Sequence, residues 1–338
     1  MRNVVARQIC VVIAFLILVT SVSAEDATFG KTREAKKPIP NVVIIVLSGV
    51  SNSESINDQT HQFLPNLWHS IIDQGTLYSN VIPLDCQFHM PVVSAILTGL
   101  VYPFSGHLRA PSIFQYVKKA YSIPSNKLWV LGEWDRDYFG YKTTDYPQDT
   151  FPSQLVALTY EMSSFAYDLL NDEEKIFVEK YKKLKRGWPQ WDSLSAMQFT
   201  IFEKIMFKLK PVLIVDIMND VESAHYDTYA RYVLALRKND ERIYKIWNII
   251  QNDPFYKDNT YLIITPDHVR NEYYMHHNDS IGNMALATWI YIYGPKIKKG
   301  AIINREVHHI DLFPTLTNIF NVLTHKHRGQ RLGDCFEK

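Results

Sequence analysis

Acidic and histidine side chains gather in three short stretches of this 338-residue sequence. They are Asp220, Glu222 and His225; Asp267 and His268; and His276 and His277. Imidazole together with carboxylate is the ligand set of zinc and related transition metals. Two such ions roughly 3.5 to 4 Å apart can clamp the attacking and leaving oxygens of a phosphoryl transfer. The residue types therefore predict a divalent metal cofactor, with zinc favoured, bound as one or two ions.

Two of these stretches directly follow apolar runs that are typical of strands buried on both faces of a parallel sheet. The predicted strands cover residues 41–47, 128–131, 212–217, 261–265 and 289–293. Ser48 follows the first, Asp220 follows the third and Asp267 follows the fourth. Ligands of open parallel sheets bind beyond the carboxyl ends of the strands. We therefore expect these side chains to converge at one edge of the sheet.

Helical patterns separate the predicted strands. Apolar residues recur at helical spacing between Tyr229 and Ile250. A shorter helix is predicted between Pro65 and Gly75 and another over residues 311–320. This alternation predicts an α/β fold in which a mostly parallel sheet carries helices on both faces. Residues 150–210 interrupt the alternation, and we predict a mainly helical insertion there, either a cap over the active face or ordinary surface helices.

Length and composition agree with one globular domain. Hydrophobic residues make up 46% of the chain and charged residues 21%, which allows a large core. The 36 basic and 35 acidic residues nearly cancel, so nothing indicates a nucleic-acid partner. We predict a single domain over residues 40–338, preceded by a linker over residues 25–39.

The N-terminus has the pattern of an export signal. Arg2 and Arg7 precede an apolar run over residues 9–20, and Ser23 and Ala24 offer small residues for cleavage. We predict a signal peptide over residues 1–24 and a periplasmic or secreted protein. This apolar run is shorter than the roughly 20 residues of a membrane-spanning helix. No other long apolar run follows, so no transmembrane segment is predicted in the mature chain. An uncleaved N-terminal anchor is the alternative.

Export also bears on the cysteines that would remain after cleavage. An oxidising compartment would allow Cys86 and Cys335 to pair, and two free thiols are equally compatible with the sequence.

Five motifs occur in a fixed order along the chain. They are PNVVIIVLSG from Pro40 to Gly49, HMPVVSAILTG from His89 to Gly99, DVESAH from Asp220 to His225, TPDH from Thr265 to His268, and DLFPT from Asp311 to Thr315. In this order and spacing the sequence resembles the alkaline-phosphatase superfamily, which includes sulfatases and nucleotide phosphodiesterases. The resemblance covers roughly residues 40–145 and 210–320. It implies an alkaline-phosphatase-like three-layer sandwich and does not specify a subfamily.

The resemblance also implies a two-metal site whose residues are partly changed. One metal position would consist of Glu222 or, alternatively, Asp220, together with His225 and either His277 or His276. The second position keeps Asp267 and His268. The first metal-binding aspartate of the family falls on Ser48, whose hydroxyl cannot replace the charge of a carboxylate.

The nucleophile position of the family falls on His89, which leaves three interpretations open. His89 restores a metal ligand, acts as a nucleophile, or lies in a catalytically inactive pocket. The leading functional prediction is metal-dependent hydrolysis of a small anionic ester, a phosphate or a sulfate. The alternative is a pseudoenzyme of the same fold that binds an anionic ligand or a partner.

Overall fold

A computed structural model describes residues 38–82, 89–101, 110–132, 154–158, 161–182, 191–224, 227–269, 287–324 and 326–338. The predicted signal peptide and nearly all of the predicted linker lie outside these residues. Within them, no helix is both long enough and apolar enough to cross a membrane.

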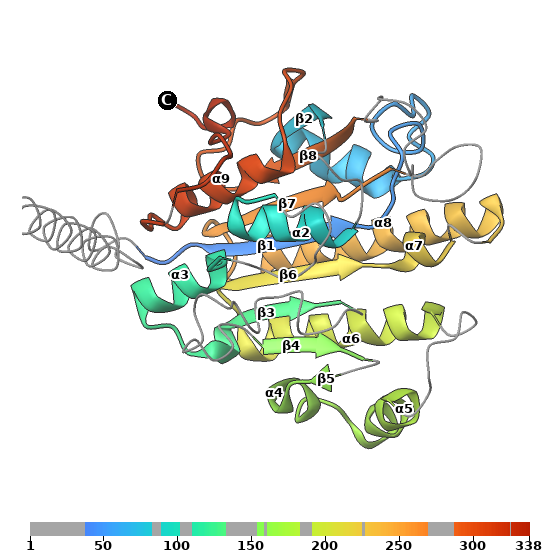
Figure 1. Ribbon diagram of the computed structural model, residues 1–338. Helices are drawn as coiled ribbons and strands as arrows, with labels where there is room; N and C mark the ends of the chain where they lie inside the picture. The colour runs from blue at the N-terminus through green and yellow to red at the C-terminus, as the bar shows by residue number, and fades with distance from the viewer. Residues whose placement is uncertain are drawn as a thin grey trace, which may run out of the picture.

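A nine-stranded sheet runs through the described part of the chain in the order β5-β4-β3-β6-β1-β7-β8-β2-β9 (Figure 1). The strands are β1 Asn41–Leu47, β2 Thr76–Val81, β3 Leu128–Leu131, β4 Gln154–Ala157, β5 Glu161–Met162, β6 Leu213–Met218, β7 Thr260–Pro266, β8 Thr288–Tyr293 and β9 Ala301–Ile303. The strands from β4 to β7 in this order are parallel, whereas β5 and β8 run antiparallel to their neighbours. The mostly parallel sheet predicted from the sequence is confirmed.

Helices cover both faces of this sheet, which confirms the three-layer arrangement (Figure 1). One face packs against α2 (His89–Thr98), α3 (Ile113–Tyr121) and α9 (Leu312–Ile319). The other packs against α6 (Trp191–Leu209), α7 (Asp220–Ala224) and α8 (Tyr229–Asn252). Alternate residues of β1 enter the two cores: Val42 and Ile44 enter one, and Val43 and Ile45 enter the other. Burial on both faces explains why this strand is apolar throughout.

The predicted helices differ in detail from the observed ones. The helix expected between Pro65 and Gly75 is a π-helical turn, η1 (Leu67–Ile71), followed by a 3₁₀ turn, η2 (Ile72–Gln74). The helix expected over 311–320 begins with a 3₁₀ turn, η6 (His309–Asp311), and continues as α9. The long helix α8 starts where its apolar pattern starts, and the Thr228 side chain caps it by accepting a hydrogen bond from the Arg231 amide.

The described parts of the region 150–210 contain α4 (Ser164–Tyr167), α5 (Asp172–Lys182) and α6. They also contain β4 and β5, which were not predicted, and β4 pairs in parallel with β3 at the side of the sheet. Phe202 and Ile205 of α6 are fully buried in the core. This helix is therefore part of one layer of the fold, unlike a surface helix or a cap.

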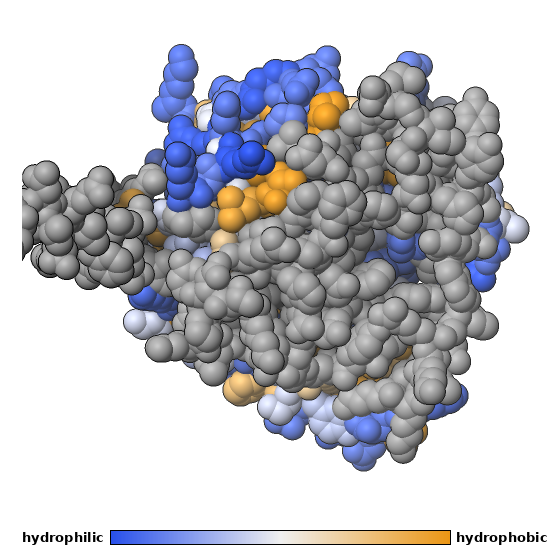
Figure 2. Space-filling view, viewed as in Figure 1, coloured by the Kyte–Doolittle hydropathy of each residue, from blue (hydrophilic) through white to orange (hydrophobic). Residues whose placement is uncertain are grey.

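The C-terminal segment closes one side of the molecule, and its described surface is largely hydrophilic (Figure 2). Within this segment, Cys335 is a buried free thiol, and its Sγ lies 3.0 Å from the Leu332 carbonyl oxygen. Cys86 lies outside the described residues. Of the two alternatives, a disulfide or free thiols, Cys335 has the free thiol.

Candidate active site

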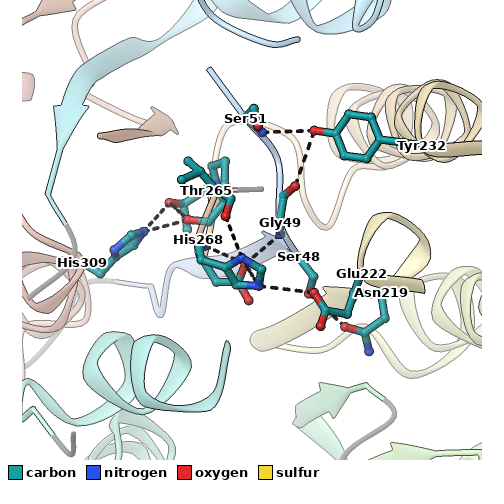
Figure 3. Close-up of polar contacts among 12 residues, drawn as sticks. Ser48, Gly49, Ser51, Asn219, Glu222, Tyr232, Thr265, His268 and His309 are labelled. Atoms are coloured by element: carbon teal, nitrogen blue, oxygen red, sulfur yellow. Dashed lines mark hydrogen bonds and ion pairs between the residues drawn. The ribbon is translucent and has the colours of Figure 1, made fainter. Parts of the chain in front are cut away.

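The site residues lie where β1, β6 and β7 end. Because β1 lies between β6 and β7 and is parallel to both, these three carboxyl ends lie side by side. Ser48 and Gly49 follow β1, and the Ser48 hydroxyl donates to Asn219 Oδ1 at 2.9 Å (Figure 3). Gly49 adopts a left-handed conformation with φ of 74°, which favours glycine at this turn.

Two backbone amides hold one oxygen of Asp267. The amides of Gly49 and His268 donate to Asp267 Oδ1 at 3.1 and 2.7 Å. The amide of Asp267 itself donates to the Leu47 carbonyl at 3.2 Å, which extends the pairing of β7 with β1 by one residue. Asp267 and His268 are completely buried. The carboxylate is therefore held rigidly at the end of the central strands.

Two carboxylates converge on one imidazole nitrogen. Nε2 of His268 lies 3.3 Å from Glu222 Oε2 and 3.6 Å from Asp267 Oδ1 (Figure 3). Glu222 belongs to α7, the short helix after β6, whereas His268 follows β7. The structure thus brings together three of the predicted site residues from two separate motifs.

Asp220, the alternative to Glu222, forms a close ion pair with Arg242 of α8. The guanidinium of Arg242 also lies 5.6 Å from the ring centroid of Phe199. Of the two acidic residues of α7, Glu222 is the one that contacts His268. The preference for Glu222 as the metal ligand stays a prediction.

The charges around His268 favour its protonated form. Burial by itself lowers the pKa of His268, but Asp267 and Glu222 outweigh burial and raise it to about 9. The isolated protein therefore holds an imidazolium between two carboxylates at neutral pH.

The donor types of this cluster fit a zinc ion, since they combine carboxylate oxygens with an imidazole nitrogen. Within the described residues, however, no group of three such side chains could by itself hold a metal ion. The further ligands expected from the sequence, His225, His276 and His277, lie outside the described residues. So does the side chain of His89, although the backbone of α2 begins at this residue.

His309, which none of the sequence motifs indicated, lies beside the same strand ends. Its Nε2 lies 2.7 Å from the Pro266 carbonyl oxygen and 3.2 Å from Thr265 Oγ1 (Figure 3). Burial lowers the pKa of His309 to about 4, so the ring is neutral at pH 7. Since the carbonyl of Pro266 can only accept, Nε2 carries the proton of the neutral ring. The signal that could have found it is its position two residues before Asp311 of the DLFPT motif.

A second buried acid, Asp216 of β6, lies within the sheet near the site. Gln198 Nε2 donates to its Oδ1 at 2.8 Å. Burial is the main reason that the pKa of Asp216 is raised to about 7, although Gln198 and Arg242 oppose this shift. Because the folded pKa exceeds the ordinary value of about 3.9, Asp216 stabilises the folded state fully only below about pH 4. This contribution is lost progressively as the pH rises to about 7.

Replacing Asp216 with asparagine is expected to remove this pH dependence. The free energy of unfolding of the variant relative to the original protein should rise by about 1.4 kcal/mol for each pH unit between 4 and 7. Urea unfolding of both proteins at several pH values in this range measures the difference. Asp73→Asn, which removes an exposed carboxylate, is the control. A difference that does not change with pH would contradict the assignment to Asp216.

Solved structures with the same architecture include several ester hydrolases and related proteins. A protein in the alkaline phosphatase superfamily from Vibrio parahaemolyticus matches with a TM-score of 0.57 and 14% identity over 89% of this chain and 71% of that chain. A phosphonate monoester hydrolase from Silicibacter pomeroyi matches with a TM-score of 0.57 and 14% identity over 87% and 76%. Murine ectonucleotide pyrophosphatase/phosphodiesterase 5, an inactive form in complex with AMP, matches with a TM-score of 0.53 and 12% identity over 88% and 100%.

The sequence itself is far from these proteins. No family model matches it, and a comparison with curated proteins gives no match. At 12 to 14% identity the similarity shows a shared fold, and it does not show a shared active-site chemistry. The fold of this chain is that of the alkaline phosphatase superfamily.

Proposed function

We propose that this protein is an exported, metal-dependent hydrolase of phosphate or sulfate esters with an altered active site. The observation that carries the proposal is the convergence of Glu222 and Asp267 on Nε2 of His268 at the carboxyl ends of the central strands. Two acidic groups held this close in a buried place favour a cation between them. The fold, shared with a phosphonate monoester hydrolase and a phosphodiesterase, supports the same class of reaction.

Glu222, Asp267 and His268 would hold the ion, with His225 and either His277 or His276 completing the set. A bound zinc ion would polarise the ester and lower the pKa of a water molecule. The residues of the chain prepare this site. The amides of Gly49 and His268 fix Oδ1 of Asp267, and the proton that His268 carries would leave when a metal binds.

The first turn of α2 is a second part of the proposed site. Free amide groups and the helix dipole stabilise an anion at the start of a helix. α2 has ten residues and begins at His89, the residue at the expected nucleophile position. An anionic ester bound there would have its reacting group next to His89.

One observation favours the second candidate, a pseudoenzyme that binds an anionic ligand or a partner. Ser48 donates to Asn219, so a neutral pair lies where the resemblance places the first metal-binding aspartate of the family. A site without this carboxylate binds a second ion less well. The pseudoenzyme would keep the fold and at most one ion.

Metal content and turnover separate the two candidates. The protein is purified without chelators, and its zinc content and its hydrolysis of several aryl phosphates and aryl sulfates are measured with and without zinc. The hydrolase is expected to bind zinc and to turn over an ester. His89→Ala should abolish turnover if His89 is a ligand or nucleophile, and equal rates would show that it has no catalytic part. The pseudoenzyme would be favoured if the original protein bound zinc without turnover. A Ser48→Asp/His89→Ser variant that also bound zinc without turnover would favour it further.

A further inference from the structure

Two phenylalanine side chains are exposed at the end of the molecule opposite the site. Phe207 lies near the end of α6 and is 49% exposed, and Phe255 follows α8 and is 38% exposed. Both α6 and α8 end where parallel strands begin (Figure 1). Phe207 and Phe255 therefore lie on the side of the amino ends of the sheet. An exposed apolar surface formed by two separate elements indicates a binding site for another molecule or for a membrane.

Contacts between side chains join the two phenylalanines into one surface. Nζ of Lys210 lies 6.0 Å from the ring centroid of Phe207 and 5.4 Å from that of Tyr256. The ring of Tyr256 packs edge-on against Phe255, with centroids 4.9 Å apart. The Tyr256 hydroxyl donates to the Met206 carbonyl at 3.0 Å, which ties the loop after α8 to the end of α6.

Lysines neighbour these rings in the sequence, together with one exposed carboxylate, that of Asp258. Lys208 and Lys257 are exposed. In the sequence, Lys208 follows Phe207 and Lys257 comes two residues after Phe255. Lys210 is half-buried and forms a close ion pair with Asp253. We call the residues Phe207, Lys208, Lys210, Phe255 and Lys257 the aromatic–lysine surface.

The chain enters the fold beside this surface. The side-chain amide of Asn41, the first residue of β1, donates to the Phe255 carbonyl at 3.0 Å. The side-chain amide of Asn259 donates to the Ile39 carbonyl, also at 3.0 Å. The described chain therefore begins, at Pro38, close to this surface.

The sequence just before Pro38 is basic. Residues 31–37 read KTREAKK, with four basic residues and one acidic residue. These residues would remain after cleavage at Ala24. They would add their positive charge to that of Lys208 and Lys257.

We propose that the aromatic–lysine surface docks on an anionic phospholipid bilayer. Phenylalanine rings enter the boundary between headgroups and acyl chains, and neighbouring lysines keep their charge at the headgroups. Each lysine or arginine near an anionic membrane adds attraction that salt screens. The predicted export signal over residues 9–20 supports this choice of partner, because such a signal would bring the chain to a membrane whether or not it is then removed.

This docking would turn the active site away from the bilayer. β1 runs from the aromatic–lysine surface to Ser48 and has seven residues, which corresponds to about 23 Å at about 3.3 Å per residue. The site would then face the aqueous phase and remain open to a soluble ester.

Sedimentation with vesicles tests the proposal without any measurement of activity. The full chain is mixed with vesicles of phosphatidylcholine alone or with phosphatidylglycerol. We expect binding to the anionic vesicles that weakens with salt. Phe207→Ser/Phe255→Ser should weaken binding at least about tenfold, and Phe207→Trp/Phe255→Trp should retain it. Lys208→Glu/Lys257→Glu should weaken binding to the anionic vesicles.

Ile302→Ser is the matched control, because Ile302 is 67% exposed but lies on β9 at the side of the sheet. It should bind as the original protein does, and thermal unfolding should show that all variants are folded. The proposal would be overturned if the original protein ignored anionic vesicles, or if the double serine variant bound them equally well. A dimer that the serine variant abolishes, without vesicle binding, would assign the surface to a second copy of the chain instead.

Discussion

Replacing His268 with alanine is expected to lower metal-dependent ester hydrolysis by more than about 100-fold. The reason is that Nε2 of His268 lies close to both carboxylates, 3.3 Å from Glu222 Oε2 and 3.6 Å from Asp267 Oδ1. Loss of a group that only orients a metal ligand already costs about 10- to 100-fold in metal affinity or activity, so loss of the ligand should cost more. Zinc-dependent rates with aryl phosphates and aryl sulfates measure the effect.

The same variant should also bind less zinc, and this result does not depend on turnover. If zinc binds the folded state as proposed, it should raise the melting temperature of the original protein, and a chelator should reverse the increase. Both changes should shrink in His268→Ala and in Glu222→Gln. His69→Ala, which removes an exposed imidazole from η1, should retain them. Unchanged zinc content and rates in His268→Ala would contradict a metal site at this position.

Replacing Arg242 with methionine is expected to lower the free energy of unfolding by about 3 to 5 kcal/mol at pH 8. Arg242 pairs with Asp220, and their side chains are 11% and 0% exposed. The variant keeps a buried carboxylate without this cation, while methionine retains an apolar chain near the ring of Phe199. Urea unfolding with matched buffers measures the loss.

The loss should depend on pH in a defined direction. Burial raises the pKa of Asp220 while Arg242 opposes the increase, so removal of Arg242 should raise the pKa further. A folded-state pKa above the ordinary value means that the deficit is largest at high pH and shrinks as the pH falls toward about 4. The double variant Asp220→Asn/Arg242→Met should recover much of the stability. An equal deficit at pH 5 and pH 8, with no recovery in the double variant, would show that the ion pair does not cause it.

Much of the sheet could be predicted because its strands carry a local signal. A strand buried on both faces needs apolar, β-branched residues at consecutive positions, and residues 41–47 satisfy this along their whole length. The predicted and observed limits of β1 and β3 are identical, and those of β6, β7 and β8 differ by one residue at one or both ends. β4 and β5 have only four and two residues, and their pairing with β3 and with each other depends on residues far apart in the sequence.

Local sequence patterns could not decide whether Asp220 or Glu222 contacts His268. Both residues precede His225 in one motif and both carry a carboxylate. They are two positions apart on α7, and residues at this spacing do not share a face of a helix. One therefore meets Arg242 of α8 and the other meets His268, and only the packing of α7 against these elements decides which.

The sequence by itself determined the layers of the fold, the order of its central strands along the chain and the strand ends at which acidic and histidine residues occur. These properties follow from residue types at close spacing, which act on the backbone locally. Only the tertiary structure decided that Glu222 contacts His268, that His309 is neutral with its proton on Nε2, and that Phe207 and Phe255 share one surface. Each of these depends on side chains that are distant in sequence and meet only when the helices and strands pack.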